Sequence, residues 1–167
     1  MPPRIIADPV LPPVRIPAPI WNEICSHALK TEPAECCGLV TGDARVRFQQ
    51  VHRCTNVIDA LHARDPLRHP CGSKLAFHMD EIEYLRVQRE AEAAGRTVTA
   101  IYHSHVGVDA HFSELDQAYA NETGFPFPEA DHIVVSVVDG LVRGGGVFRR
   151  EPRDAGFRGR RLEEARP

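Results

Sequence analysis

Residues 97–116, TVTAIYHSHVGVDAHFSELD, constrain the fold more than any other segment of the chain. The apolar run at the start of this segment predicts a strand with a buried middle. Ser113 and Asp116 then have the S-x-x-D spacing of a helix N-terminus, where each side chain bonds the other residue's free amide. The segment therefore predicts a strand followed by a helix that begins at Ser113 and runs to Asn121.

Other parts of the chain also show helix and strand patterns. Residues 20–30 have helical apolar spacing with Pro19 in the first turn, and residues 80–94 predict a helix with Met79, Ile82 and Leu85 facing inward. We expect an α/β or α+β fold, in which helices pack on a sheet. The predicted strands are 36–42, 45–53 and 97–105, and 132–138 and 142–150 form a hairpin around Asp139-Gly140.

The remaining segments lack periodicity. Residues 1–19 are proline-rich and predict an extended arm with an edge strand at 14–16. Two irregular loops, 55–77 and 122–131, are long for a compact domain. Residues 150–167 are rich in arginine and predict a flexible tail. The expected organisation is an arm (1–19), a single domain (20–149) and a tail (150–167).

Composition restricts the class of protein. The chain has 167 residues and a net charge of −3, which disfavours a nucleic-acid partner because phosphate binding needs a basic face. No apolar stretch approaches the ~20 residues of a membrane span, and the proline-broken N-terminus is a poor signal peptide. Five cysteines without framework spacing favour reduced thiols and a cytoplasmic location.

The polar residues of 97–116 suggest a metal site. Residues i and i+2 of a strand point to the same face, so His103 and His105 can either line a polar surface or converge on one ion. Asp116, in the first turn of the next helix, would bring a third ligand to the same point. Two nitrogens and one oxygen leave the fourth position of zinc open for water, which is the pattern of a catalytic zinc site.

These residues resemble the JAMM (MPN-plus) zinc metalloproteases, which include deubiquitinating isopeptidases. The family pattern H-x-H-x(7)-S-x(2)-D is reproduced from His103 to Asp116, and the upstream P-x-E-x-C-G is matched by PAECCG at 33–38. The resemblance spans roughly residues 20–149 and implies a cytidine-deaminase-like central mixed sheet flanked by helices. Many members have proline where this chain has Val106 and Phe112, so the loop between them is expected to be less rigid than in those members.

The resemblance implies a role for each motif residue. His103, His105 and Asp116 would hold one zinc ion per chain together with a catalytic water. Glu35 would be the general base, and Ser113 would donate a hydrogen bond to the developing oxyanion. The capping interpretation of Ser113 remains open beside the catalytic one, because the hydroxyl oxygen can accept from the helix amide while its hydrogen faces the site.

The implied function is zinc-dependent peptidase or isopeptidase activity at the bond after the C-terminal Gly-Gly of a ubiquitin-like or sulfur-carrier protein. The two irregular segments, approximately 57–78 and 121–131, would bind the partner's tail as an added strand. The alternative is a non-catalytic MPN-type protein-binding scaffold. A zinc deaminase would need H-x-E and P-C-x-x-C, which are both missing from the chain. Homo-oligomerisation is left open.

Other polar residues carry weaker hypotheses. Glu32 precedes Pro33 and is expected in solvent, whereas Ser104 should point away from the two histidines and hydrogen-bond within the fold. Cys36 and Cys37 are neighbours on a strand and cannot both bind the metal. His52, His62, His69 and His78 show no ligand spacing and are expected to have surface or structural roles. Asp109 and His111 are expected on the surface, with contact to substrate as the alternative, and His132 opens a strand without an assigned role.

Overall fold

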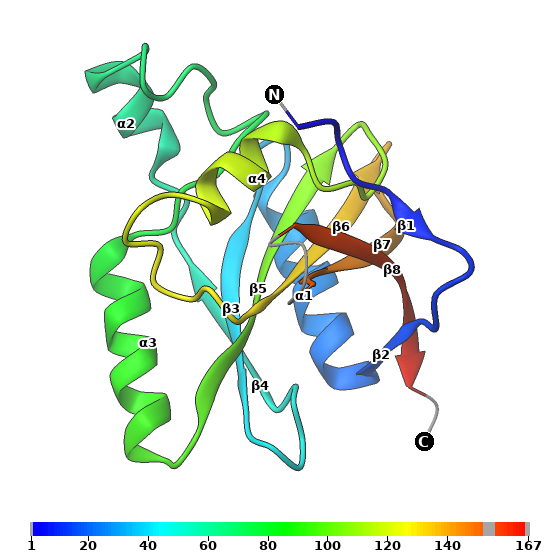
Figure 1. Ribbon diagram of the computed structural model, residues 1–167. Coiled ribbons are helices and arrows are strands. Elements are labelled where there is room, and N and C mark those ends of the chain that lie inside the picture. Colours follow the sequence, from blue (N-terminus) through cyan, green and yellow to red (C-terminus); the bar gives the residue numbers. More distant parts are fainter. Residues whose placement is uncertain (1, 152–155, 166–167) are drawn as a thin grey trace.

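The computed structural model describes residues 2–151 and 156–165. A mixed eight-stranded sheet with strand order β1-β8-β7-β6-β5-β3-β4 forms its centre, and β2 also pairs with β8 (Figure 1). The helices are α1 (Ala18–Thr31), α2 (Ile58–Arg64), α3 (Glu81–Ala93) and α4 (Glu114–Ala120). The strands are β1 (Ala7–Asp8), β2 (Val14–Pro17), β3 (Cys37–Gly42), β4 (Gln50–Cys54), β5 (Thr97–Val106), β6 (Asp131–Val138), β7 (Leu141–Arg150) and β8 (Phe157–Ala165).

Helices cover both faces of the sheet, as the fold class predicts. Strand β5 runs through the middle, parallel to β6 and antiparallel to β3. Its even-numbered residue Tyr102 packs with α1, whereas its odd-numbered Ile101 packs in a second core with residues of α3 and α4. His103 and His105 continue the odd-numbered series, so both side chains emerge on the face that α3 and α4 cover.

The predicted hairpin is confirmed. Strands β6 and β7 pair in antiparallel register up to Val138 and Leu141. The two residues between them, Asp139 and Gly140, have φ angles of 53° and 71°. Positive φ at both positions is what a two-residue type I′ turn requires, and Asp-Gly is one of the sequences that adopt it readily.

The prediction of a flexible C-terminal tail is wrong for residues 157–165. They form β8, which pairs with β7 on one side and with β1 and β2 on the other. Phe157 and Gly159 are buried in this arrangement. Residues 152–155 and 166–167 of the predicted tail lie outside the described residues. The N-terminal arm contains the expected strand at 14–17 and, in addition, β1.

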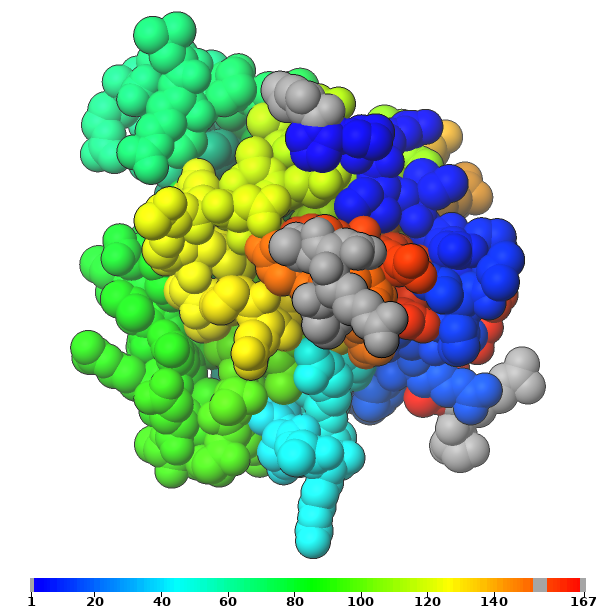
Figure 2. All heavy atoms as spheres, viewed as in Figure 1, coloured from blue at the N-terminus to red at the C-terminus, as the bar shows by residue number. Residues whose placement is uncertain are grey.

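Two other expectations are corrected. Helix α3 faces inward through Val87 and Ala91 together with the preceding Met79, whereas Ile82 and Leu85 are 79% and 39% exposed. The segment 55–77, predicted as an irregular loop, contains α2, which stands out from the body of the molecule as a separate lobe (Figure 2).

Candidate metal centre

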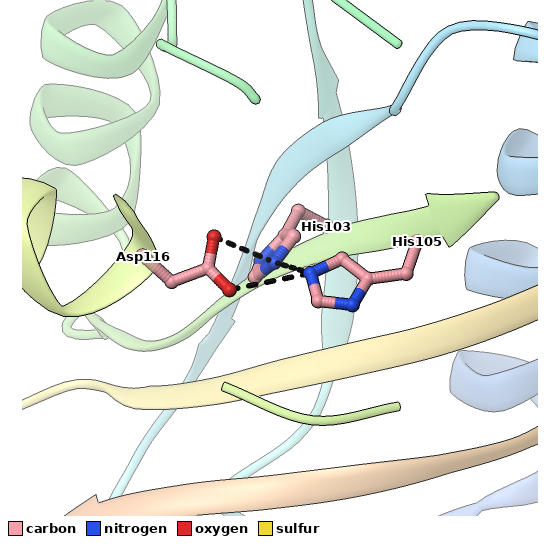
Figure 3. A group of neighbouring side chains, drawn as sticks. All are labelled: His103, His105 and Asp116. Carbon is pink, nitrogen blue, oxygen red and sulfur yellow. Dashed lines mark hydrogen bonds and ion pairs between the residues drawn. The ribbon is translucent and has the colours of Figure 1, made fainter. Parts of the chain in front are cut away.

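His103, His105 and Asp116 converge on one point inside the protein. The two histidines come from β5 and the aspartate from the first turn of α4, and the three side chains point toward one another (Figure 3). The Nε2 atoms of the histidines are 3.2 Å apart, and each is 3.2 Å from a different carboxylate oxygen of Asp116. These ligand atoms all lie within 4.8 Å of one another. None of the three residues is more than 4% exposed.

The charges of these groups are tightly linked. Burial favours the neutral acid, but the adjacent imidazoles outweigh it and hold the pKa of Asp116 well below its usual range. Burial lowers the pKa of His103 and keeps this imidazole neutral. At His105, the hydrogen bond and charge of Asp116 outweigh burial and raise the pKa. A carboxylate and a neutral imidazole are the forms that bind cations, so the raised pKa of His105 makes a proton compete with a metal at this residue.

Neighbouring groups orient both imidazoles. The backbone carbonyl of Asp109 lies 3.2 Å from Nδ1 of His105, which fixes Nε2 as the atom that faces Asp116. The ring of His103 stacks on Phe77 with 4.3 Å between the ring centroids. Its Nδ1 has no hydrogen-bond partner among the described residues. Sequence reasoning missed the contacts of Phe77 and the Asp109 carbonyl with the two imidazoles, because neither an apolar ring nor a backbone oxygen leaves a motif.

Glu35 lies beside the triad. Cys37, the first residue of β3, pairs with His103 on β5, and Glu35 lies two residues before it in the chain. The Glu35 carboxyl interacts electrostatically with both His105 and Asp116. Glu35 is 4% exposed and its Oε2 has no hydrogen-bond partner among the described residues. Burial raises the pKa of this carboxyl to about 8, with the charge of His105 opposing and that of Asp116 adding to the shift. A cation held by the triad would lower this pKa again.

Three contacts hold the backbone around Glu35. Its N–H donates to the carbonyl of Ser73 at 2.7 Å, and its own carbonyl accepts from the side-chain amide of Asn56 at 3.0 Å. On the α1 side of the sheet, the hydroxyl of Ser104 accepts from the N–H of Cys36 at 2.8 Å. Ser104 therefore points away from the histidines, as expected, and ties the strand of the two ligands to the segment that carries Glu35.

Ser113 caps α4, as the S-x-x-D spacing predicts. Its hydroxyl accepts from the N–H of Asp116 at 3.1 Å, and its N–H donates to the Asp116 carboxylate at 2.8 Å. The second bond leaves that carboxylate shared between the cap and the histidines. Phe112, which stands where many family members have proline, donates its N–H to the carbonyl of Ile5 at 2.8 Å. Proline cannot form that bond because it has no N–H.

The remaining candidates lie away from the three ligands or at their margin. Cys36 and Cys37 face opposite sides of the sheet and pack in different cores. His132 is buried among aromatic rings of Phe112, Phe125 and Phe157. The ring of His111 contacts that of His105, with centroids 4.6 Å apart.

A pocket of about 80 Å³ opens beside the triad. Asp116 and Tyr119 of α4 form one wall, and the segment that contains α2 forms the other through residues such as Phe77 and His78. Of the three ligands, Asp116 is the one that lines this pocket. The segment 55–77, which looked irregular in the sequence, therefore shapes the space next to the metal centre.

Two buried imidazoles and a carboxylate, with a second carboxyl group beside them, define a metal-dependent hydrolase site. A sequence model of the prokaryotic homologs of the JAB domain matches residues 17–150, and the chain belongs to this family. It is a JAMM-type hydrolase, which confirms the resemblance that the H-x-H-x(7)-S-x(2)-D spacing indicated.

Two relatives with named activities are similar to this chain at 28–29% identity. The chain is 28% identical over 124 residues to the CysO-cysteine peptidase of Mycobacterium tuberculosis, which covers 74% of this chain and 73% of the relative. It is 29% identical over 111 residues to the desampylase of Haloferax volcanii, which covers 64% of this chain and 71% of that protein. A solution structure of a protein from Desulfitobacterium hafniense has the same fold, with a TM-score of 0.64, 18% identity and coverage of 90% and 92%.

No helix among the described residues is both long enough and apolar enough to cross a bilayer.

Proposed function

We propose that this chain is a zinc-dependent peptidase or isopeptidase that hydrolyses the bond after the C-terminal Gly-Gly of a ubiquitin-like or sulfur-carrier protein. His103, His105 and Asp116 hold the metal, Glu35 is the general base and Ser113 donates to the oxyanion. The observation that carries the proposal is the convergence of three buried ligand atoms beside a buried carboxyl group, one oxygen of which has no hydrogen-bond partner among the described residues. The printed names of the relatives, a CysO-cysteine peptidase and a desampylase, support the substrate class.

The donor set fits zinc. Two imidazole nitrogens and one carboxylate oxygen are common zinc ligands, and three protein ligands leave a position for water or substrate. The 3.2 Å separations bring nitrogen and oxygen atoms together at a point without an apolar side chain between them. When bound, the metal supplies Lewis acidity, which lowers the pKa of water and polarises the scissile carbonyl.

The protein residues then move one proton and stabilise one charge. Glu35 accepts a proton from the attacking water through its buried carboxylate and returns it to the leaving amine. The carboxyl is 4% exposed and interacts electrostatically with His105 and Asp116, which places it near the triad instead of in solvent. Ser113 keeps its oxygen on the N–H of Asp116, so its hydroxyl hydrogen is free to donate to the oxyanion.

The pocket between α4 and the segment 57–78 suits an extended tail. A peptide that enters here approaches Asp116 along a wall formed by Phe77, His78 and Tyr119. Glycine has no side chain, so a Gly-Gly end lets the peptide backbone reach a small space beside buried ligands. We propose that the segments 57–78 and 121–131 select the tail by strand addition and by contacts in this pocket.

The test uses zinc-loaded protein and a ubiquitin-like sulfur carrier extended past its Gly-Gly. We expect the wild type to cleave after Gly-Gly and Glu35→Gln to lose activity while its zinc content is retained. Glu32→Gln is the matched control, because Glu32 lies three residues upstream at the end of α1 and outside the site; this variant should cleave like the wild type. Stoichiometric zinc without cleavage of any such tail would instead support the protein-binding scaffold.

A further inference from the structure

The N-terminal arm touches the loop that joins the two parts of the metal centre. Ile5 and Phe112 form an isolated antiparallel bridge, with N–H···O distances of 2.9 Å from Ile5 to Phe112 and 2.8 Å in return. Figure 2 shows the first described residues lying against the region of α4. The arm therefore adds a short piece of strand to a loop that comes between the histidine ligands and Asp116.

Two side chains extend this contact on either side of the bridge. The side-chain amide of Gln117, which is 5% exposed, donates to the carbonyl of Pro3 at 3.0 Å. The guanidinium of Arg4 lies 3.9 Å from the carboxylate of Asp109, and both side chains are largely exposed. The buried amide bond is the stronger of the two constraints, because solvent screens an exposed ion pair.

Each contact ends next to a residue of the metal centre. Phe112 immediately precedes Ser113, and Gln117 immediately follows Asp116. Asp109 is the residue whose carbonyl faces the ring of His105. The connection from 107 to 112 has two other supports. Its start is held by bonds from the Gly107 N–H to Val137 and from the Ser136 hydroxyl to Val108, and its end by the packing of the Phe112 ring in the buried aromatic cluster.

The arm itself is anchored away from the site. Ile5 packs beside a buried cluster that contains Phe112, Phe148 and Phe157. Two residues later, β1 pairs with β8, with Ala7 opposite Gly159. The position of Ile5 is therefore set by the sheet, and the bridge transmits that position to Phe112.

We propose that Pro3–Ile5 is a positioning element for the metal centre, which holds the 109–113 loop and the start of α4 so that Asp116 reaches the point where the histidines meet. The inference rests on the proposed function only in taking this centre to bind zinc. Groups that orient metal ligands typically change metal affinity by roughly 10- to 100-fold when they are removed.

The experiment measures zinc affinity of the full chain by competition with a chromophoric chelator, and the visible absorption of the cobalt(II)-substituted protein. Ile5→Pro removes the N–H that bonds Phe112. Gln117→Leu removes the donor to Pro3 and, with it, a longer bond of 3.4 Å to the carbonyl of Phe112. We expect each variant to bind zinc roughly 10-fold more weakly or worse and to show altered cobalt absorption. Val10→Ala is the control, since Val10 lies on the same arm and is 87% exposed; its affinity and spectrum should match the wild type.

Wild-type affinity and an unchanged cobalt spectrum in folded Ile5→Pro would overturn the inference, provided that amide hydrogen exchange at Phe112 shows the bridge to be broken. If Ile5→Pro does not fold, Gln117→Leu decides in the same way. Peptide cleavage is measured separately. A wild type that binds zinc and cleaves nothing refutes the peptidase proposal without affecting the role of the arm.

Discussion

Replacing Ser113 by glycine and by alanine separates the two roles that this residue can have. In the structure its hydroxyl accepts from the N–H of Asp116 at 3.1 Å, and that bond is lost in both variants. The reciprocal bond, from the backbone N–H of Ser113 to the Asp116 carboxylate at 2.8 Å, remains in both. Loss of a serine cap to alanine costs about 1 kcal/mol, and to glycine only a few tenths. The free energy of unfolding should therefore fall in the order wild type, glycine, alanine.

Catalysis should follow a different order. Both variants lack the hydroxyl hydrogen, and removal of one oxyanion donor typically lowers kcat by about 100- to 1000-fold, or roughly 3–4 kcal/mol. We therefore expect glycine and alanine variants to lose kcat equally, although their stabilities differ. The assay is cleavage of the extended carrier tail at saturating zinc, beside urea unfolding of the same samples. Zinc titration of each variant verifies that Asp116 still binds the metal.

Two results would contradict a catalytic role for Ser113. If Ser113→Gly cleaves within a few-fold of the wild type, the hydroxyl does not donate to the oxyanion and Ser113 is a helix cap alone. If the activities of the two variants instead follow their unfolding free energies, the loss comes from a loosened start of α4. Either result would refute the catalytic role and leave the metal centre as described.

Three further outcomes are expected. Zinc affinity should rise with pH through the raised pKa of His105, because zinc must displace the proton on this imidazole. The pKa is raised because the hydrogen bond and charge of Asp116 outweigh burial. Calorimetry in buffers of different ionisation enthalpy measures the proton released on binding. Burial lowers the pKa of His132 to about 3, so between pH ~6.5 and 3 only the unfolded chain binds this proton and stability falls as pH falls; His132→Leu should flatten that part of the acid unfolding curve. Asp131→Asn should lower the free energy of unfolding by about 1–3 kcal/mol in urea titrations, because this 3% exposed carboxylate bonds Arg47 at 3.0 Å and Arg149 at 2.9 Å.

The sequence was most informative where the determining interactions are local. His103 and His105 are two residues apart on a strand, and Ser113 and Asp116 are three apart at a helix start, so backbone geometry alone predicts where these side chains point. Glu35 is different. No local rule brings residue 35 to residue 105, and its assignment came from the motif resemblance. The pairing of Cys37 with His103 and the bonds between Cys36 and Ser104 supply the physical reason, because they hold the two segments side by side.

Sequence patterns failed where several faces or partners were available. In α3, the apolar residues 82 and 85 suggested one buried stripe, but the sheet covers Val87 and Ala91, and Ile82 is left in solvent. Periodicity identifies candidate faces of a helix and does not show which face tertiary packing will cover. For β8, the sequence FRGRRLEEA has many charged residues. Its strand depends on pairing with the preceding strand β7 and with β1 and β2 at the other end of the chain.

The N-terminal arm and the C-terminal tail, which the sequence placed outside the domain, together support the loop before α4. Strand β8 lies between β7 and β1, so it is the element that connects the N-terminal arm to the central sheet. The arm in turn bonds Phe112 through Ile5, and Phe112 is one residue before the N-cap of the helix that carries Asp116. Neither β8, which is rich in arginine, nor the proline-rich N-terminal arm is expected to be ordered alone. Each buries too little apolar surface to offset the conformational entropy lost on ordering. Paired with each other they are ordered, and the loop between the histidine and aspartate ligands gains a support that its own sequence does not contain.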